Sequence, residues 1–434
     1  MIKNKVANLK ELKIKAIIIA VLFAVIALSF FFAKNLEAAF GLNETFAKNQ
    51  VSSNVAQNSD YSVSYIDVGE GNSCFVKFPD GKTMLIDGGG VSAGETVVEF
   101  LKDNAVEEID YLIATHADSD HIGGLVSVLQ NFSVKNIYRP FQISGKGTSA
   151  NEFVVSEYED LKPVYLKLMQ ETGGRSEISR VTTDVFEEFV KLIYEESYIE
   201  NGKKIFSTVT VFYDGLKIAN GNYSIEFFAP LKRDSNTNLE DLTDNTMGFA
   251  TIGYGVTASN ENSAIFLLSI YDDTFLFTGD ASFNDESDSK EDNFAEDDFI
   301  GSLTNDEKDK LSAVSVYLAG HHGSKNSSSE KLLELISPKF VVFSVGKNND
   351  YGHPSPEVLD RVKKTENFEE DYLLRTDRDG TIMFLRVGGE LCYSTSLYNR
   401  DESLTMSWYE IGGIIFISTS YIVVFIKPKQ KKQI

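Results

Sequence analysis

Histidine is scarce in this 434-residue chain, which contains only five. None lies on an apolar helical face, and all sit in loop-like contexts flanked by glycine or proline. No histidine occurs between residues 122 and 320, which excludes that long stretch as a source of imidazole ligands. A lone histidine is more often a satisfied core residue than a metal ligand, so the clustering of the five matters: His116, His121, His321, His322 and His353.

Positive charge is also in short supply, with 41 Lys and Arg against 64 Asp and Glu. Residues 35–408 hold 31 of the basic and 62 of the acidic residues, a formal charge of −31. Such a surface repels polyanions unless the site itself is locally positive. The basic residues near the motifs described below are few, so a nucleic-acid partner is disfavoured without being excluded: Lys325, Lys347, Arg375 and Arg378.

Cysteine occurs only twice, at Cys74 and Cys392. Both residues lie in strand-like stretches. They could pair in an oxidising compartment or stay as two buried thiols, and the sequence leaves both readings open.

Histidine and aspartate side chains that could bind a metal are most densely clustered within residues 109–125. A short apolar run, residues 111–114, predicts a buried strand, and residues 122–129 predict a helix packed against it. Between these elements, the six residues 116–121 carry four potential metal ligands: His116, Asp118, Asp120 and His121. Imidazole nitrogens and carboxylate oxygens at this spacing suit Zn²⁺, Mn²⁺ or Fe²⁺. The alternative is an Asp-rich helix cap with incidental histidines.

Two later stretches repeat the pattern of an apolar strand that ends in a ligand-bearing turn. Residues 275–280 read Phe-Leu-Phe-Thr-Gly-Asp and present one carboxylate, that of Asp280. Residues 314–319 form another apolar run, which leads directly to His321 and His322. The three stretches together predict one composite metal site.

With these three ligand-bearing stretches the chain resembles the metallo-β-lactamase-fold hydrolases, and among them the hydrolase domain of the ComEC competence proteins. The resemblance covers roughly residues 61–387, and it implies an α/β fold of αββα type, with two facing sheets and helices outside. The stretches that carry it are residues 66–73, 80–89, 115–124, 276–280, 321–325, 344–349, 351–354 and 375–381.

The resemblance also implies a site for two divalent metal ions. His116 and Asp118 would hold the first ion, Asp120 and His121 the second, and Asp280 both. His322 would complete the second position, and His321 would contact its surroundings or the substrate, although the reverse assignment stays open. Many family members have histidine where this chain has Asp118, so the first position is rich in oxygen and favours Mn²⁺ over Zn²⁺. An amide, Asn260 or Asn262, could complete it.

The chemistry expected of such a site is hydrolysis of a phosphodiester by a metal-bound hydroxide. Asp120, His321 and His353 are the candidate catalytic residues, with His353 a general acid or a phosphate contact. Ser324 and Lys325 precede a predicted capping box at residues 327–330, and a capped helix over residues 331–336 would complete a phosphate seat. A purely structural cap is the alternative.

The two ends of the chain carry uncharged apolar runs, residues 16–33 and 411–426, each with lysines on one side. Both predict transmembrane helices with cytoplasmic basic tails and an extracytoplasmic domain between them. A cleaved signal peptide and a buried terminal element are the alternatives. The predicted organisation is an anchor over residues 1–34, a linker over 35–60, a hydrolase domain over 61–395 with insertions at 152–206 and 284–310, and a second anchor within 396–434.

The sequence thus predicts a membrane-anchored, extracytoplasmic, metal-dependent phosphodiesterase. A ComEC-like nuclease, a hydrolase of lactones, esters or amides, and a binding protein with a decayed site are the alternatives.

Overall fold

The computed structural model describes residues 49–51, 59–140, 143–144, 180–181, 183–229, 232–233, 247–248, 260–283, 295–366 and 368–397. The chain divides into two units, residues 1–51 and 52–434, and the fold below is that of the second unit. Both apolar terminal runs lie outside the described residues. Within the described part of the chain, no helix has the length and apolar character needed to cross a bilayer.

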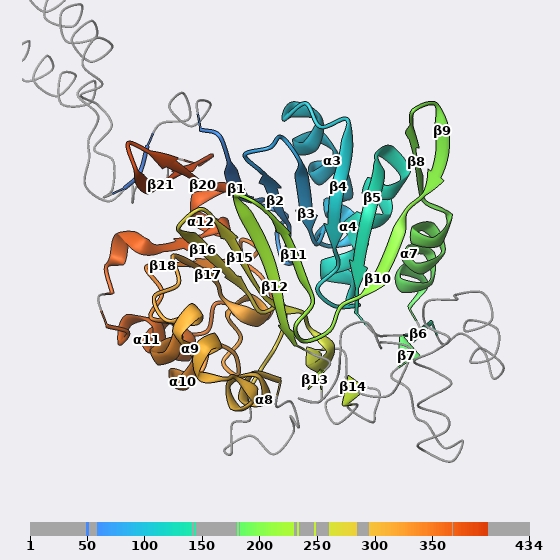
Figure 1. The fold of residues 1–434 in the computed structure, drawn as a ribbon. Coiled ribbons are helices and arrows are strands. Elements are labelled where there is room, and N and C mark those ends of the chain that lie inside the picture. Colours follow the sequence, from blue (N-terminus) through green and yellow to red (C-terminus); the bar gives the residue numbers. More distant parts are fainter. Residues whose placement is uncertain are drawn as a thin grey trace, which may run out of the picture. The chain divides into compact units, whose positions relative to one another are not determined.

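Two large sheets form the centre of the second unit (Figure 1). The first has eight strands in the order β10-β5-β4-β3-β2-β1-β20-β21, and β3, β4, β5 and β10 run parallel. Its strands are β1 (Ser62–Tyr65), β2 (Cys74–Lys77), β3 (Thr83–Ile86), β4 (Glu108–Ile113), β5 (Ser133–Arg139), β10 (Thr208–Val211), β20 (Ile382–Val387) and β21 (Glu390–Thr395).

The second sheet has seven strands in the order β11-β12-β15-β16-β17-β18-β19, and its last four strands are parallel. They are β11 (Lys217–Asn220), β12 (Tyr223–Ala229), β15 (Ile265–Ile270), β16 (Asp273–Phe277), β17 (Val316–Leu318), β18 (Phe340–Phe343) and β19 (Leu373–Arg375). Three short pairs lie apart from both sheets: β6 (Ile143–Ser144) with β7 (Arg180–Val181), β8 (Ser197–Glu200) with β9 (Lys203–Phe206), and β13 (Lys232–Arg233) with β14 (Met247–Gly248).

Aromatic side chains fill the space between the two sheets. Tyr65 of β1 stacks on Phe277 of β16, with ring centroids 6.0 Å apart, and Phe384 of β20 meets Phe340 of β18 at 5.2 Å. Large rings supply most of the apolar area in such a layer. The sheets therefore pack face to face, as the resemblance implies.

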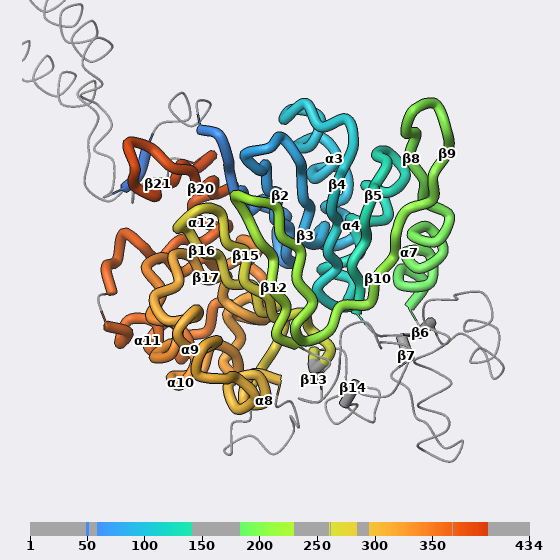
Figure 2. The backbone as a smooth tube through the Cα atoms, viewed as in Figure 1, coloured from blue at the N-terminus to red at the C-terminus, as the bar shows by residue number. Residues whose placement is uncertain are grey.

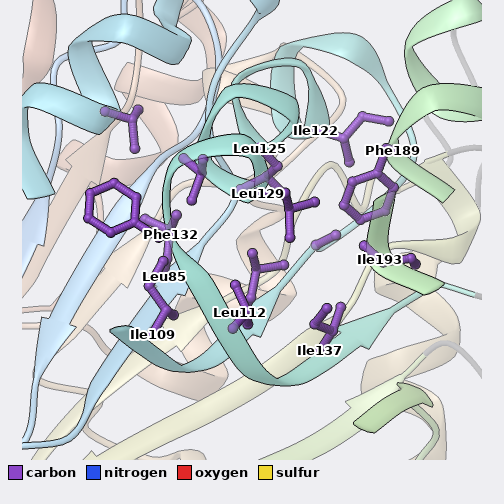
Figure 3. Close-up of a cluster of buried hydrophobic side chains, with 14 of the residues drawn as sticks. Leu85, Ile109, Leu112, Ile122, Leu125, Leu129, Phe132, Ile137, Phe189 and Ile193 are labelled. Carbon is purple, nitrogen blue, oxygen red and sulfur yellow. The ribbon is translucent and has the colours of Figure 1, made fainter. Parts of the chain in front are cut away.

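Helices cover the outer face of the first sheet (Figures 1 and 2). They are α3 (Gly94–Asp103), α4 (Ser119–Asn131) and α7 (Asp184–Glu195), with the short η1 (Val91–Ala93) before α3. Figure 3 shows side chains from these helices meeting the strands in one buried cluster. Among its members are Leu85, Leu112, Leu125, Leu129, Ile137 and Phe189.

A second helical layer covers the other sheet. It consists of α8 (Ala295–Ser302), α9 (Asn305–Leu311), α10 (Glu330–Ile336) and α11 (Pro356–Lys363), and its buried residues include Phe299, Leu311, Leu332 and Val358. The remaining short elements are η4 (Asn260–Asn262), η5 (Gly320–Gly323), η6 (Glu370–Tyr372) and α12 (Thr376–Asp379). The αββα order predicted from the resemblance is confirmed.

Apolar residues at helical spacing predict helices over residues 152–172 and 183–196 of the first insertion, and the acidic composition of residues 284–310 predicts an exposed loop that ends in a helix. α7 matches the helix expected over residues 183–196, and it packs against α4 in the first core rather than standing apart. The hairpin β8-β9 follows it and was not predicted. Residues 152–172 and the acidic residues 284–294 lie outside the described residues, whereas α8 and α9 form the helical end of the second insertion.

The two cysteines, on β2 and β21, are both buried and form no disulfide. Of the two readings that the sequence left open, the structure selects buried thiols.

Candidate metal centre

The three ligand segments follow three strand ends. Residues after β4 lead into α4, residues 278–280 follow β16, and η5 follows β17. The His321 amide donates to the Gly279 carbonyl (3.0 Å) and joins the second and third segments, while the Ala264 amide, just before β15, donates to the Thr115 carbonyl (2.8 Å) of the first. The parallel β16 and β17 end at the same edge of their sheet, which brings Asp280 and the histidine pair together.

Asp280 lies at the middle of the cluster and is 2 % exposed. Its Oδ1 is 3.1 Å from Nε2 of His121. Its Oδ2 is 3.6 Å from Nε2 of His116 and 3.8 Å from Nε2 of both His321 and His322. Four of the five histidines therefore converge on one carboxylate.

The second metal position predicted from the sequence is a compact group. Asp120, His121, Asp280 and His322 each offer a ligand atom, and these atoms all lie within 4.8 Å of one another. Nε2 of His322 is 3.3 Å from Oδ2 of Asp120. The structure thus brings together the residues that the resemblance assigns to this position.

Both histidines of this position are oriented through their other ring nitrogen. Nδ1 of His121 donates to Oδ2 of Asp87 at 2.7 Å, and Nδ1 of His322 donates to the carbonyl of Ser344 at 3.0 Å. With Nδ1 protonated, each neutral ring presents the Nε2 lone pair to the cluster. This is the tautomer that a metal ligand needs.

Asp87 is a supporting residue that the sequence reasoning missed. It is 1 % exposed and also accepts hydrogen bonds from the backbone N–H (2.7 Å) and the hydroxyl (2.6 Å) of Thr115. It lies near the end of the motif of residues 80–89, directly after β3. A carboxylate that directly follows a buried strand, within a motif of the resemblance, was the available signal.

The first metal position is more open. Nε2 of His116 lies 3.7 Å from Oδ2 of Asp118, whose side chain is 44 % exposed. Asp118 is the N-cap residue of α4, yet its side chain makes no capping hydrogen bond. This argues against the reading of the acidic loop as a helix cap, because a capping aspartate accepts from the amides of the first turn. Asn262 is buried on η4, next to Ser263, whose hydroxyl accepts from the Asp280 amide (3.0 Å).

η5 holds the histidine pair in an unusual backbone conformation. His321 has φ 48° and His322 has φ 52°, both in the left-handed region. For residues other than glycine this conformation costs on the order of 1–3 kcal/mol each, and it persists where the surroundings impose it. Here the Gly320 amide donates to the Tyr317 hydroxyl (3.2 Å), and Nδ1 of His321 lies 3.2 Å from the Ser282 hydroxyl.

The charges of the cluster are interdependent. Burial raises the pKa of Asp280, but the positive charges of His121, His322, His321 and His116 outweigh it and bring the pKa well below its usual value. Burial likewise raises the pKa of Asp120, and the contact with His322 and the charge of His121 more than reverse this. Burial lowers the pKa of His121, but the charges and hydrogen bonds of Asp280 and Asp87 raise it by more, so the pKa lies well above its usual value. Both carboxylates are therefore ionised at neutral pH.

These residues fit divalent metal ions. Nε2 of His116, His121 and His322 and Oδ1 of Asp280 are buried and face one another without forming hydrogen bonds among the described residues. Buried polar atoms without partners carry a large desolvation penalty. A cation bound among them would satisfy all of these lone pairs at once, and the mixed nitrogen and oxygen donors suit Zn²⁺ and Mn²⁺.

His353 lies beside this cluster. Its ring centroid is 6.0 Å from that of His321 and 6.5 Å from that of His322. Tyr351, which is 75 % exposed, stacks on it with centroids 5.6 Å apart. Glu70 approaches from the loop after β1, with Oε1 3.3 Å from Nδ1 of His353. The sequence predicted His353 at the site, whereas Glu70 was missed.

The structure at the start of α10 differs from the phosphate-binding site that the sequence predicts. α10 begins at Glu330 with Ser329 as its N-cap, whose hydroxyl accepts from the Leu332 amide (3.1 Å), so the capping box predicted to begin at Ser327 is wrong. The amides of Ser328 and Ser329 donate to the buried carboxylate of Glu296, at 2.9 and 2.7 Å. The amides at the start of the helix therefore already donate to a carboxylate of the protein. Ser324 is half-buried and Lys325 exposed, so both can still meet a ligand.

Comparison with known proteins places these observations in a family context. Residues 66–176 match the model of the Metallo-beta-lactamase superfamily. The chain is 27 % identical to ComE operon protein 3 of Bacillus subtilis over 343 residues. This match covers 75 % of this chain and 33 % of that protein. It is also 42 % identical over 69 residues to Competence protein ComA of Neisseria gonorrhoeae, covering 16 % of this chain and 9 % of that protein. The chain thus spans about a third or less of these relatives.

Solved structures are similar at lower identity. The metallo-beta-lactamase fold protein YhfI from Bacillus subtilis matches at 11 % identity with a TM-score of 0.35, covering 73 % of this chain and 95 % of that one. CmlA, a diiron beta-hydroxylase from Streptomyces venezuelae, matches at 14 % identity with a TM-score of 0.36, covering 79 % and 57 %.

Proposed function

We propose that this chain, which carries a metallo-β-lactamase superfamily domain and is similar to ComEC-family competence proteins, is a two-metal hydrolase of phosphodiesters. The observation that carries the proposal is the convergence of four histidines on the buried carboxylate of Asp280. Asp120 adds a second carboxylate beside His322. A decayed site would not be expected to keep this whole donor set together.

Each residue has a defined part in the proposal. Asp120, His121 and His322 would hold one ion and His116 and Asp118 the other, while Asp280 lies near both sets of ligands. Two bound ions supply a nucleophile from water at neutral pH and stabilise charge on the attacking and leaving oxygens. Asp87 and the Ser344 carbonyl keep the rings of His121 and His322 in place.

The substrate we favour is a small phosphodiester. Ser324 follows the histidine pair after Gly323 and Lys325 is exposed beside it, so a hydroxyl and one cation can contact a phosphate. The helix terminus of α10 adds no anion site because Glu296 already accepts its amides. One such cluster suits a single phosphate, whereas a long strand needs many cationic contacts.

We also propose that the domain is held at the outer face of a membrane by the apolar runs of residues 16–33 and 411–426. Five lysines precede the first run and four follow the second, against Lys34 next to the first run on the side that faces the domain, and this excess supports the orientation. Protease added to intact cells should then remove the middle of the chain and spare both ends. Protection of the whole chain would contradict this topology.

The activity is tested by a competition on the metal-loaded protein at physiological salt. Bis-p-nitrophenyl phosphate, a lactone and single-stranded DNA are compared by kcat/KM, and the bound metals are counted by elemental analysis. We expect the chromogenic phosphodiester to be preferred, and Asp120→Asn to lose the activity. Faster cleavage of DNA, with binding that falls steeply with salt, would favour the nuclease that the similarity to competence proteins suggests. Preference for the lactone would contradict both.

A further inference from the structure

Two loops far apart in the sequence meet at His353. The loop after β1 carries Glu70, and the loop between β18 and α11 carries Gly346 and His353. A Cβ atom placed on Gly346 would lie 2.7 Å from the Glu70 nitrogen, so only glycine lets the two backbones come this close. Ser344 strengthens the junction because its hydroxyl donates to the Gly71 carbonyl at 2.7 Å.

The carboxylate of Glu70 bridges this junction. Its Oε2 accepts from the Gly346 amide at 2.9 Å, which fixes the carboxylate, and its Oε1 is 3.3 Å from Nδ1 of His353. The backbone of His353 is fixed as well, since its amide donates to Oδ1 of Asn349 and its carbonyl accepts from Nδ2 of the same side chain, at 2.9 and 2.7 Å. Ring and backbone are therefore both held.

This arrangement determines which ring nitrogen is available. A carboxylate only accepts hydrogen bonds, so Nδ1 of His353 must carry a proton toward Glu70. Nε2 is then the nitrogen that can act, and it has no hydrogen-bond partner among the described residues. The His353 side chain is 13 % exposed, and its ring neighbours those of His321 and His322. A substrate at the metal centre can reach it.

We propose that Glu70 is a positioning residue that orients His353 so that Nε2 donates a proton to the leaving oxygen. The inference rests on the proposed phosphodiester hydrolysis. The oxygen of the attacking water forms a bond to phosphorus as the bond between phosphorus and the leaving oxygen breaks. In the doubly protonated ring, Nε2 gives its proton to that oxygen and leaves a neutral ring with its proton on Nδ1, the proton of the water passes to solvent, and solvent returns a proton to Nε2. A carboxylate paired with a histidine in this way holds the ring and stabilises its charged form.

The first test reads the ring directly and needs no turnover. With five histidines in the chain, nitrogen-15 NMR of the zinc-loaded 434-residue protein can be assigned by single variants such as His353→Gln. We expect His353 to carry its proton on Nδ1 when neutral. In Glu70→Gln the amide oxygen can keep the Gly346 contact while its N–H faces Nδ1, so the proton should move to Nε2. A neutral His353 protonated on Nε2 in the unaltered protein would overturn the proposal.

The second test uses the leaving group. A proton donor matters most when the departing oxygen is a poor leaving group, so kcat is compared for p-nitrophenyl and alkyl phosphodiesters. Glu70→Gln should lose about 10- to 100-fold on the alkyl ester and only a few-fold on the p-nitrophenyl ester, in the range seen for residues that orient a functional histidine. Glu390→Gln, the same change at an exposed position on β21, should lose nothing. Equal losses on both esters would overturn the proposal.

A double variant separates positioning from general damage. If Glu70 acts through His353, then Glu70→Gln combined with His353→Gln should be no slower than His353→Gln alone. Additive losses would mean that Glu70 acts elsewhere. If the unaltered protein hydrolyses no phosphodiester, the proposed function fails, and the NMR measurement alone decides whether Glu70 positions His353.

Discussion

The two proposed metal positions would share Asp280, and the chain supports their candidate ligands differently. At the second position, His121 is held by Asp87 at 2.7 Å and His322 by the Ser344 carbonyl at 3.0 Å. At the first position, Nδ1 of His116 has a 3.5 Å contact with the Thr115 hydroxyl, and Asp118 is 44 % exposed. Because supporting contacts set ligand orientation, the second position is preorganised and the first is looser.

The difference arises from the start of α4. The Asp120 carbonyl accepts from the Asn72 amide (3.2 Å), and the His121 carbonyl accepts from the Gly88 amide (2.7 Å), so this turn is tied to two other loops. Gly124 lets the loop pack closely, since a Cβ there would overlap the Gly88 carbonyl. Asp118 precedes the helix. The same short motif thus supplies one rigid and one adjustable set of ligands.

Removing one carboxylate from each position tests most directly whether the two positions differ. We expect Asp120→Asn to lower kcat/KM on the order of 10³-fold, because it removes charge from the preorganised position. Asp118→Asn, the matched change at the looser position, should lower it only about 10-fold, since an amide oxygen can still bind a cation. Kinetics with bis-p-nitrophenyl phosphate and metal counting on both variants check this. Equal losses would show that the two positions are equivalent.

The two neighbouring histidines also differ in what adjoins their supports. His322 is held by a backbone carbonyl, whereas His321 contacts Ser282, whose carbonyl accepts from the Glu296 amide at 3.0 Å. Glu296 is 1 % exposed, and burial raises its pKa to about 7, although the hydrogen bonds from Ser329 and Ser328 oppose the shift. A carboxyl group that titrates near neutrality therefore lies next to the support of His321 along the backbone.

The stability of the fold should reflect this titration. The native state holds the Glu296 proton more tightly than the unfolded state, so the contribution is present below the unfolded pKa and lost as pH rises through about 7. Between pH 5 and 8 the free energy of unfolding should fall by about 3 kcal/mol from this group. Urea titrations should show a flatter profile for Glu296→Gln, while Asp306→Asn, an exposed change on α9, keeps the original slope. An unchanged slope in Glu296→Gln would refute the assignment.

Local sequence patterns predicted which histidines and carboxylates come together, but not the residues that support them. The ligand-bearing turns follow strands whose apolar character is visible in the sequence, whereas the αββα order was implied by the resemblance. Asp87 and Glu70 contact their histidines across 34 and 283 residues, so no spacing rule connects them. Glu296 belongs to an acidic stretch that looked fully exposed, and it is buried because its partners are backbone amides 32 and 33 residues away. Backbone partners leave no trace in a side-chain pattern.

Changing Asp87, which supports His121, tests the role of this contact without changing a ligand. Asp87→Asn keeps an oxygen for Thr115, but the amide no longer holds Nδ1 of His121 as a carboxylate does. We expect metal affinity at the second position to fall about 10- to 100-fold. Competition with a chelator measures the effect, and Asp103→Asn at the exposed end of α3 is the control. Unchanged affinity would mean that His121 is oriented by its packing alone.

The smallest expected effect concerns which metal occupies the looser position. Its donors are His116, Asp118 and the shared Asp280, a set with more oxygen than nitrogen, and such sets favour Mn²⁺ relative to Zn²⁺. Activity should therefore be about 3- to 10-fold higher with Mn²⁺, in keeping with the modest selectivity of mixed donor sets. Asp118→His replaces an oxygen by a nitrogen and should reverse the preference, whereas Asp118→Asn retains an oxygen and should not. Because the second position keeps its ligands in all three proteins, any change in preference reports on the first. A preference for Zn²⁺ in the unaltered protein that Asp118→His leaves unchanged would show that the tighter position alone selects the metal.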